Sequence, residues 1–258
     1  MENVTSKDGT TIAFDRLGSG PPVILVSGGS VDRGSNAGLA DLLARQFTVI
    51  NYDRRGRGPS GDTQPYAVQR EVEDLDAVIG AAGGAAGLYG SSSGAALVLE
   101  AAAAGLAVTK LALWEPPYIG EGRPRPAEDT ASIYRKFVAE GKRGDAVEYF
   151  MAKVVGMPAD FVGFARSQPW WPAQEALAHT LAYDAEIMGD YVLPTDRIAR
   201  IGAPTLVLTG SESFDWMDET AKAIVDALPD GQHRILEGAT HDVDANILGP
   251  VLAEFFAG

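Results

Sequence analysis

Continuous apolar runs rich in β-branched residues alternate with helical patterns along this chain of 258 residues. Such runs predict strands buried on both faces, because a strand with one solvated face would alternate apolar and polar residues. The predicted strands are residues 23–26, 47–50, 87–89, 111–114, 205–208 and 233–236. Predicted helices separate the first four strands, at residues 37–45, 65–79 and 95–104. This alternation is typical of an α/β fold with a mostly parallel sheet flanked by helices.

The first residues of the chain depart from this pattern. Asp8-Gly9 lies between Val4-Thr5 and the alternating residues 11–14. An Asp-Gly pair between two short strand patterns is turn chemistry. We therefore expect an antiparallel hairpin at one edge of the sheet.

A second departure lies between the strands at 111–114 and 205–208, where the sequence has no convincing buried strand. Helical patterns predict helices there at residues 133–140, 146–155 and 173–187. We predict that residues 116–200 form a helical cap inserted into a core domain. That core domain would consist of residues 1–115 and 201–258.

Residues 90–94, Gly-Ser-Ser-Ser-Gly, fit the pattern G-x-S-x-G between a predicted strand and an Ala-rich helix. A sharp strand-to-helix turn would hold Ser92 in a strained backbone, with glycine on both sides to avoid clashes and the hydroxyl exposed at the end of the strand. The backbone N–H of Ser93 and the amino end of the helix would face a developing oxyanion there. The alternative is a Ser/Gly turn that only caps a helix, a role that suits the side chains of Ser91 and Ser93.

Several segments together resemble the α/β-hydrolase family over nearly the whole chain. They are the strand at 23–26, the loop Tyr52–Ser60 with its D-x-R-G-x-G-x-S pattern, the serine turn and residues 239–243. The resemblance implies an α/β-hydrolase fold with Ser92 as the nucleophile. Because Ser27-Gly28-Gly29 stands where many members have His-Gly, it also implies the Gly29 N–H as a second oxyanion donor.

His241 is the candidate base among three histidines. It follows the last predicted strand in a loop rich in small residues, which is also the position that the family uses. A neutral imidazole within reach of Ser92 would take its proton and later return it to the leaving group.

The acid breaks the family's usual pattern. Many members carry it as Asp in G-x-x-D after the strand at 205–208, but this chain has Gly210-Ser211-Glu212-Ser213 there. Some members, including certain haloalkane dehalogenases and the zearalenone-lactonase type, place it where Glu115 follows the strand at 111–114. A carboxylate at a strand end is costly to desolvate unless it has a partner, and a histidine N–H would be one. We predict Glu115 as the acid; Glu212 or Asp215 on a remodelled loop is the alternative, and Glu115 could instead cap a turn or meet an arginine.

Aromatic residues gather in and beside the predicted cap. They would either pack the insertion onto the sheet or line a substrate pocket beneath it. The candidate pocket residues are Trp114, Trp170, Trp171 and His179. For His179, which lies on a predicted helix of the insertion, a structural role is the alternative to a substrate contact.

The composition argues against several classes of binding partner. With 21 Lys and Arg against 35 Asp and Glu, the formal charge of -14 repels phosphate backbones and anionic lipid surfaces. The chain has no cysteine and three histidines, so we expect no metal and no cofactor. The start shows neither the basic segment nor the apolar stretch of a secretory signal. We expect a cytoplasmic protein that acts on a small molecule, without nucleic-acid or membrane partners; its oligomeric state stays open.

These features predict a serine hydrolase that cleaves a carboxylic ester, lactone or thioester of a mainly apolar small molecule through an acyl-enzyme on Ser92. The same triad could instead serve carbon-carbon bond hydrolysis, cofactor-free perhydrolysis or a lyase reaction. A ligand-binding protein with low turnover is the non-enzymatic alternative. Serine at position 92 excludes the aspartate nucleophile of dehalogenases and epoxide hydrolases.

Overall fold

Eight strands form one sheet in the order β1-β2-β4-β3-β5-β6-β7-β8 in the computed structural model, which describes residues 1–120 and 122–258. The strands are β1 (Glu2–Thr5), β2 (Thr11–Leu17), β3 (Pro22–Val26), β4 (Thr48–Tyr52), β5 (Ala86–Ser91), β6 (Val108–Trp114), β7 (Thr205–Gly210) and β8 (Gly231–Leu236). The pairs β1–β2 and β2–β4 are antiparallel, and every other pair is parallel. The mostly parallel sheet and the hairpin at its edge are therefore confirmed.

Helices connect the strands and form the insertion. The α-helices are α1 (Ala37–Leu43), α2 (Val68–Ala81), α3 (Ser93–Ala103), α4 (Thr130–Ala139), α5 (Arg143–Tyr149), α6 (Ala159–Ala165), α7 (Trp171–Leu177), α8 (Leu181–Met188), α9 (Thr195–Ile198), α10 (Asp215–Ala227) and α11 (Ala245–Ala257). Short 3₁₀ segments are η1 (Arg33–Asn36) and η3 (Ala178–Thr180), and η2 (Phe150–Val155) is a π-helical segment. Within the described part of the chain, no helix combines the length and the apolar character needed to cross a membrane.

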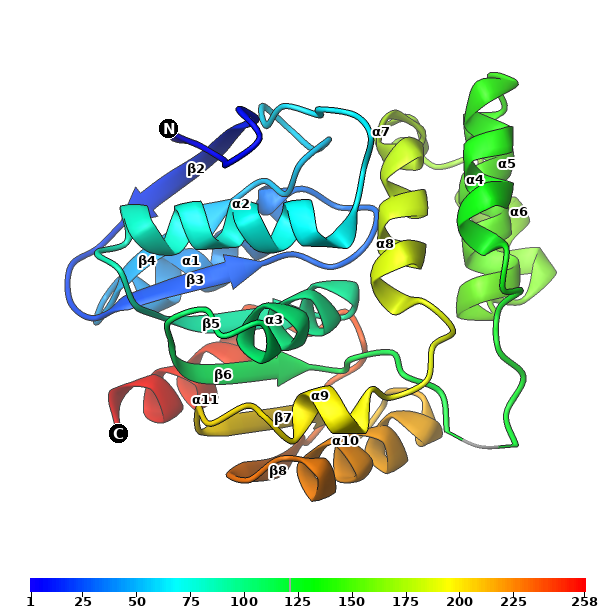
Figure 1. Ribbon diagram of the computed structural model, residues 1–258. Coiled ribbons are helices and arrows are strands. Elements are labelled where there is room, and N and C mark those ends of the chain that lie inside the picture. The colour runs from blue at the N-terminus through cyan, green and yellow to red at the C-terminus, as the bar shows by residue number, and fades with distance from the viewer. Residues whose placement is uncertain (121) are drawn as a thin grey trace.

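Helices cover both faces of the sheet, as Figure 1 shows. On one face, α1 and α11 pack on a cluster that includes Val23, Leu25 and Leu206. On the other face, α2, α3 and α10 pack on a cluster that includes Ile24 and Leu88. Neighbouring residues of one strand thus enter opposite clusters, which is why these strands are continuous apolar runs.

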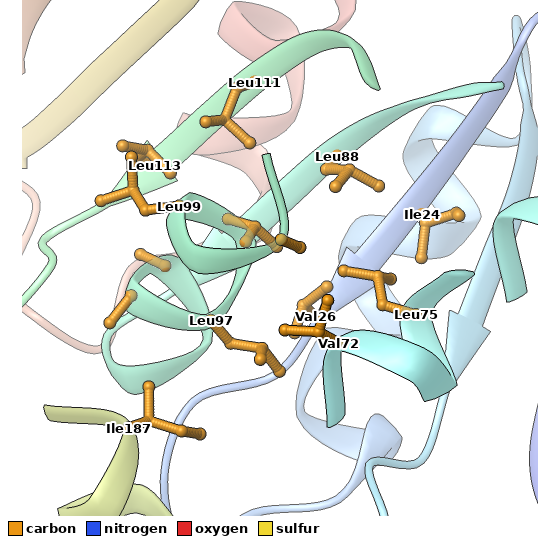
Figure 2. Packing of buried hydrophobic residues seen from close by; sticks show 14 of the residues in the cluster. Ile24, Val26, Val72, Leu75, Leu88, Leu97, Leu99, Leu111, Leu113 and Ile187 are labelled. Carbon is orange, nitrogen blue, oxygen red and sulfur yellow. The ribbon is translucent and has the colours of Figure 1, made fainter. Parts of the chain in front are cut away.

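Figure 2 shows the second of these clusters. Side chains of β3, β5 and β6 meet those of α2 and α3, with one contribution from α8: Ile24, Val26, Leu88, Leu111, Leu113, Val72, Leu75, Leu97, Leu99 and Ile187. Burying each such side chain contributes about 1.5–3 kcal/mol. This packing fixes the ends of β5 and β6, after which Ser92 and Glu115 follow.

The segment between β6 and β7 is helical throughout its regular structure in the described residues and carries α4 to α9. In Figure 1 the arrows of β3 and β6 point toward α8, and α4, α5 and α6 stand beyond it. The insertion therefore lies at the carboxyl end of the parallel strands. It has its own apolar cluster, in which Tyr134 and Trp171 are buried. Its status as a separate cap domain with limits at 116 and 200 stays a prediction.

Two predicted helices of the insertion are interrupted. The pattern at 146–155 forms α5 and then the π-helical η2, and the pattern at 173–187 is divided between α7, η3 and α8. In η3 the Thr180 hydroxyl donates to the Leu177 carbonyl at 2.8 Å. This local bond competes with regular helix geometry, as hydroxyls of Ser and Thr often do within helices.

The two glycines of the serine turn are required by close packing. A Cβ on Gly90 would lie 2.5 Å from the Gly94 carbonyl oxygen, and a Cβ on Gly94 would lie 2.5 Å from the Ser27 carbonyl oxygen. Both contacts are with backbone, which cannot rotate away. The predicted need for glycine on both sides of Ser92 is thus borne out by the packing.

We predict that Gly94→Ala destabilises the protein by about 1–3 kcal/mol or more, because the added methyl overpacks the contact between α3 and the Ser27 loop. Gly163→Ala is the matched control, since Gly163 also lies in a helix and nothing is within 4 Å of its added methyl. The control should be neutral or stabilising by up to about 1 kcal/mol. Urea unfolding measures both free energies, and equal values would contradict the packing argument.

Candidate active site

Ser92 occupies the turn between β5 and α3 with φ 53° and ψ −122°. A positive φ outside glycine costs on the order of 1–3 kcal/mol and persists only where the surroundings impose it. Here the Ser92 N–H donates to the Trp114 carbonyl at 2.8 Å, which ties the turn to the end of β6. Ser92 lines a cavity at this edge of the sheet.

His241 lies in the loop after β8, with its side chain 37% exposed, and lines the same cavity as Ser92. Its Nδ1 is 2.6 Å from Oε2 of Glu115. Its backbone carbonyl accepts a 2.9 Å hydrogen bond from Nε1 of Trp114. With Nδ1 engaged by the carboxylate, Nε2 is the ring nitrogen left to act as a base.

Glu115 directly follows β6 and is completely buried. Its Oε1 accepts from the Gly210 N–H at 2.8 Å, and its Oε2 accepts from the Ser213 hydroxyl at 2.8 Å in addition to facing His241. Burying a carboxylate without partners costs several kcal/mol. Three partners on the two oxygens satisfy the hydrogen-bonding capacity of this buried side chain.

The structure thus brings Glu115, and neither alternative acid, to His241. Glu212 and Asp215 are exposed, and Asp215 is the first residue of α10. The chain carries Ser213 where the family's usual pattern has Asp, and the hydroxyl of this serine supports the carboxylate that comes from β6. Sequence reasoning missed this role of Ser213, although a small hydroxyl at the expected Asp position was the signal for it.

Gly29 and Ser93 both lie beside Ser92 in the cavity wall. Ser93 is the first residue of α3, so its backbone N–H is among those without a partner inside the helix. A Cβ on Gly28 would lie 3.2 Å from the Ser92 Cβ, which shows how closely the loop after β3 approaches the serine turn. The loop that carries Gly29 and the turn that carries Ser93 therefore lie close together in the wall of this cavity.

The cavity has a volume of about 540 Å³. Its apolar side chains come largely from the insertion and from the region where α10 begins: Phe150, Met151, Phe161, Trp170, Phe214 and Trp216. A cavity of this size with a mainly apolar lining is typical of small-molecule sites.

Among the described residues, the cavity lining includes Trp170 but not the other three residues predicted for the pocket. Trp114 is fully buried in the core beneath His241. Trp171 packs inside the insertion, where its Nε1 donates to Glu175 at 2.8 Å. The prediction that Trp114 and Trp171 line the pocket is therefore wrong. Large aromatic residues near a site often pack against the scaffold instead of contacting the cavity.

His179 also lies outside the cavity lining. Its Nδ1 is 2.9 Å from Arg143, and its Nε2 is 3.8 Å from Asp62. Burial, together with the Arg143 guanidinium, lowers the pKa of His179. Its contacts are therefore structural ones between the insertion and the core.

Sequence reasoning also missed a buried charge in the cavity wall. Asp184 of α8 lines the cavity and accepts hydrogen bonds from Arg54, Arg57 and the Ser93 hydroxyl. The signal was an acidic residue in the mainly apolar segment 181–188 of the insertion, together with the arginine-rich loop 54–57. Within the described part of the chain, no group of three or more His, Asp or Glu side chains is arranged to hold a metal ion.

Comparison with known proteins identifies the family of this chain. The model of the "Alpha/beta hydrolase family" matches residues 23–247. The crystal structure of an alpha/beta hydrolase from Sphaerobacter thermophilus DSM 20745 is 53% identical, with a TM-score of 0.94 over 99% of this chain and 100% of that one. The esterase RhEst1 from Rhodococcus sp. ECU1013 is 23% identical, with a TM-score of 0.72 over 100% of this chain and 98% of that one. At that identity the likeness is one of fold.

A curated relative matches over a shorter length. The uncharacterized hydrolase YraK of Bacillus subtilis (strain 168) is 34% identical over 96 residues, which cover 36% of this chain and 35% of that protein. The aligned part thus spans about a third of that relative's length.

Proposed function

Because this chain belongs to the alpha/beta hydrolase family, we propose that it is a serine hydrolase of a mainly apolar small molecule. The bond cleaved would be that of a carboxylic ester, lactone or thioester, through an acyl-enzyme on Ser92. His241 would serve as the base, Glu115 as the acid that orients it, and the backbone N–H groups of Gly29 and Ser93 as oxyanion donors.

The 2.6 Å contact between His241 Nδ1 and Glu115 Oε2 carries this proposal. A buried carboxylate on Nδ1–H holds the imidazole in the tautomer whose Nε2 accepts a proton, and it stabilises the imidazolium that forms. Two further hydrogen bonds, from Gly210 and Ser213, fix the carboxylate itself. The geometry therefore supports an acid and base pair beside a serine in a strained turn.

In the first half of the reaction, Nε2 of His241 would take the Ser92 proton as Oγ attacks the carbonyl carbon. The carbonyl oxygen would gain negative charge between the two backbone donors, and the amino end of α3 would favour that charge. His241 would then protonate the leaving group. In the second half, water would repeat the sequence on the acyl-enzyme and release the acid.

The lining of the cavity supports an apolar acyl or alcohol part in the substrate. Phe161 and Trp170 are partly exposed and line the cavity, so they would be the first residues that an entering apolar molecule meets. The protein carries a formal charge of -14, which disfavours anionic substrates in general. A strong preference for small charged esters across a panel of acyl chains would contradict this substrate class.

We expect Ser92→Ala to abolish ester hydrolysis and labelling by a fluorophosphonate probe while leaving the fold intact. The change removes a hydroxyl in a turn and no packing, so circular dichroism and the unfolding midpoint should match the parent. Ser91→Ala is the matched control in the same turn and should keep labelling. Hydrolysis at the parental rate by Ser92→Ala would rule out the serine nucleophile.

We expect Glu115→Gln to lower kcat on the order of 10³- to 10⁴-fold, because the amide keeps the shape but no longer stabilises the imidazolium. Asp215→Asn and Glu212→Gln, which remove exposed carboxylates from the later loop, should change kcat only several-fold. Steady-state kinetics on one activated ester compares all three. If Asp215→Asn were as damaging as Ser92→Ala and Glu115→Gln were not, the acid would belong to the later loop.

A further inference from the structure

Arg57 links the loop after β3 to the insertion inside the protein. Its side chain is 1% exposed. Its NH1 donates to the carbonyl of Gly28 and, at 3.0 Å, to that of Val31. Its NH2 donates to both carboxylate oxygens of Asp184 on α8, at 2.8 and 3.0 Å. One guanidinium thus holds a backbone carbonyl on one side and a carboxylate on the other.

The Gly28 carbonyl belongs to the same peptide unit as the Gly29 N–H. A peptide unit is planar and trans, so its C=O and N–H point in opposite directions. By holding the carbonyl, Arg57 turns the Gly29 N–H away from itself, and both glycines line the cavity. Because neither glycine carries a side chain that would restrict rotation of this peptide, an external contact is needed to fix it.

We infer that Arg57 and Asp184 are positioning residues for the oxyanion donors. This inference rests on the proposed function, since it concerns the donors that would stabilise the acyl-transfer intermediate. Neither side chain would touch the reacting atoms. They would act through the orientation of the Gly28-Gly29 peptide and through Ser93.

The second donor is tied to the same carboxylate. The Ser93 hydroxyl donates to Oδ1 of Asp184 at 2.8 Å, and NH1 of Arg54 donates to that oxygen at 2.8 Å. A Cβ on Gly29 would lie 3.2 Å from Oδ2 of Asp184. Asp184 therefore stands between the two residues whose N–H groups would form the oxyanion hole.

Charge balance in the network keeps Asp184 ionised. Arg54 is also paired with Glu71, with Nε–Oε2 at 2.7 Å, so two buried cations face two buried carboxylates. Burial opposes ionisation of Asp184, but the guanidinium groups of Arg57 and Arg54 outweigh it and lower the pKa of this carboxyl. An amide at position 184 would leave Arg57 with a weaker partner and free to shift from Gly28.

A neighbouring ion pair gives a matched control. Arg55 comes from the same loop as Arg57, is fully buried and makes a two-bond contact with Asp74 of α2, at 2.7 Å for both bonds. Its other contacts are with Asp8 and the Arg70 carbonyl, and neither belongs to the serine turn or to the loop after β3. Breaking it should cost stability without moving the Gly28-Gly29 peptide.

The test compares Asp184→Asn and Arg57→Lys with Asp74→Asn and Arg55→Lys in the full chain. For hydrolysis of p-nitrophenyl hexanoate, we expect the first pair to lower kcat on the order of 10²-fold with KM within about twofold. The reason is that a misplaced donor weakens a hydrogen bond to the oxyanion, and this bond forms only in the transition state. Affinity for a trifluoromethyl ketone, whose adduct with Ser92 carries an oxyanion, should fall by the same factor. The control pair should keep kcat and ketone affinity within about threefold at a similar loss of unfolding midpoint.

A readout that does not need activity is the amide resonance of Gly29 in a ¹H–¹⁵N spectrum. It should shift in the Asp184 and Arg57 variants and stay in place in the control variants. An unmoved Gly29 resonance, or equal kinetic losses in both pairs, would overturn the inference. So would unfolding of both Asp184→Asn and Arg57→Lys with folded controls, since the network would then serve stability. A parent protein that neither hydrolyses esters nor binds the ketone would instead refute the proposed function, and the Gly29 resonance would still test the peptide orientation.

Discussion

A carboxylate without access to water is the constraint on which this site depends. Glu115 is fully buried, so its charge must be met by groups of the protein itself. Those groups come from the ends of the next two strands: Gly210 and Ser213 at the end of β7, and His241 after β8. The parallel order β6-β7-β8 brings these ends to one edge of the sheet. The topology of the sheet therefore brings Glu115 and His241 together, and the close-packed turn after β5 places Ser92 in the wall of the cavity that His241 also lines.

The site combines an apolar cavity lining with buried ionic contacts behind it. Aromatic and methionine side chains line a cavity of about 540 Å³, yet Asp184 of the insertion reaches through this lining to Arg54 and Arg57 of the core. Inside a region of low polarity such contacts are strong when complete and costly when broken. The insertion is thus tied to the serine turn by ionic contacts as well as by packing. In our account its position bears on the oxyanion donors as much as on the substrate.

Most of the fold could be predicted from the sequence because its strands are short, continuous apolar runs. Strands of this kind are buried on both faces, which is typical of a parallel sheet covered by helices on both sides. The serine turn could be predicted too, because the G-x-S-x-G pattern has glycine at the two positions, Gly90 and Gly94, where a side chain would clash with the backbone. Glu115 could be named as the candidate acid because it directly follows a buried strand, at a position where some members of the resembled family carry theirs. The pocket could not be predicted residue by residue. Trp171 and His179 are residue types that often line pockets, but their contacts depend on how the insertion packs.

Contacts between segments far apart in the chain were beyond sequence reasoning for the same reason. Nothing local to Arg57 indicates that its partner is Asp184, 127 residues away. The role of Ser213 likewise depends on the approach of two strand ends. A charged residue within an apolar helix and a serine at an expected Asp position are signals that something polar is near, but they do not say what it is.

The most direct test of the central claim, that Glu115 holds His241 through Nδ1, is the ¹H–¹⁵N spectrum of the histidine side chains. The account predicts a strongly hydrogen-bonded Nδ1–H resonance of His241 in the parent. This resonance should be lost or moved upfield in Glu115→Gln and unchanged in Asp215→Asn. The opposite pattern, with the resonance sensitive to Asp215 and indifferent to Glu115, would contradict the account.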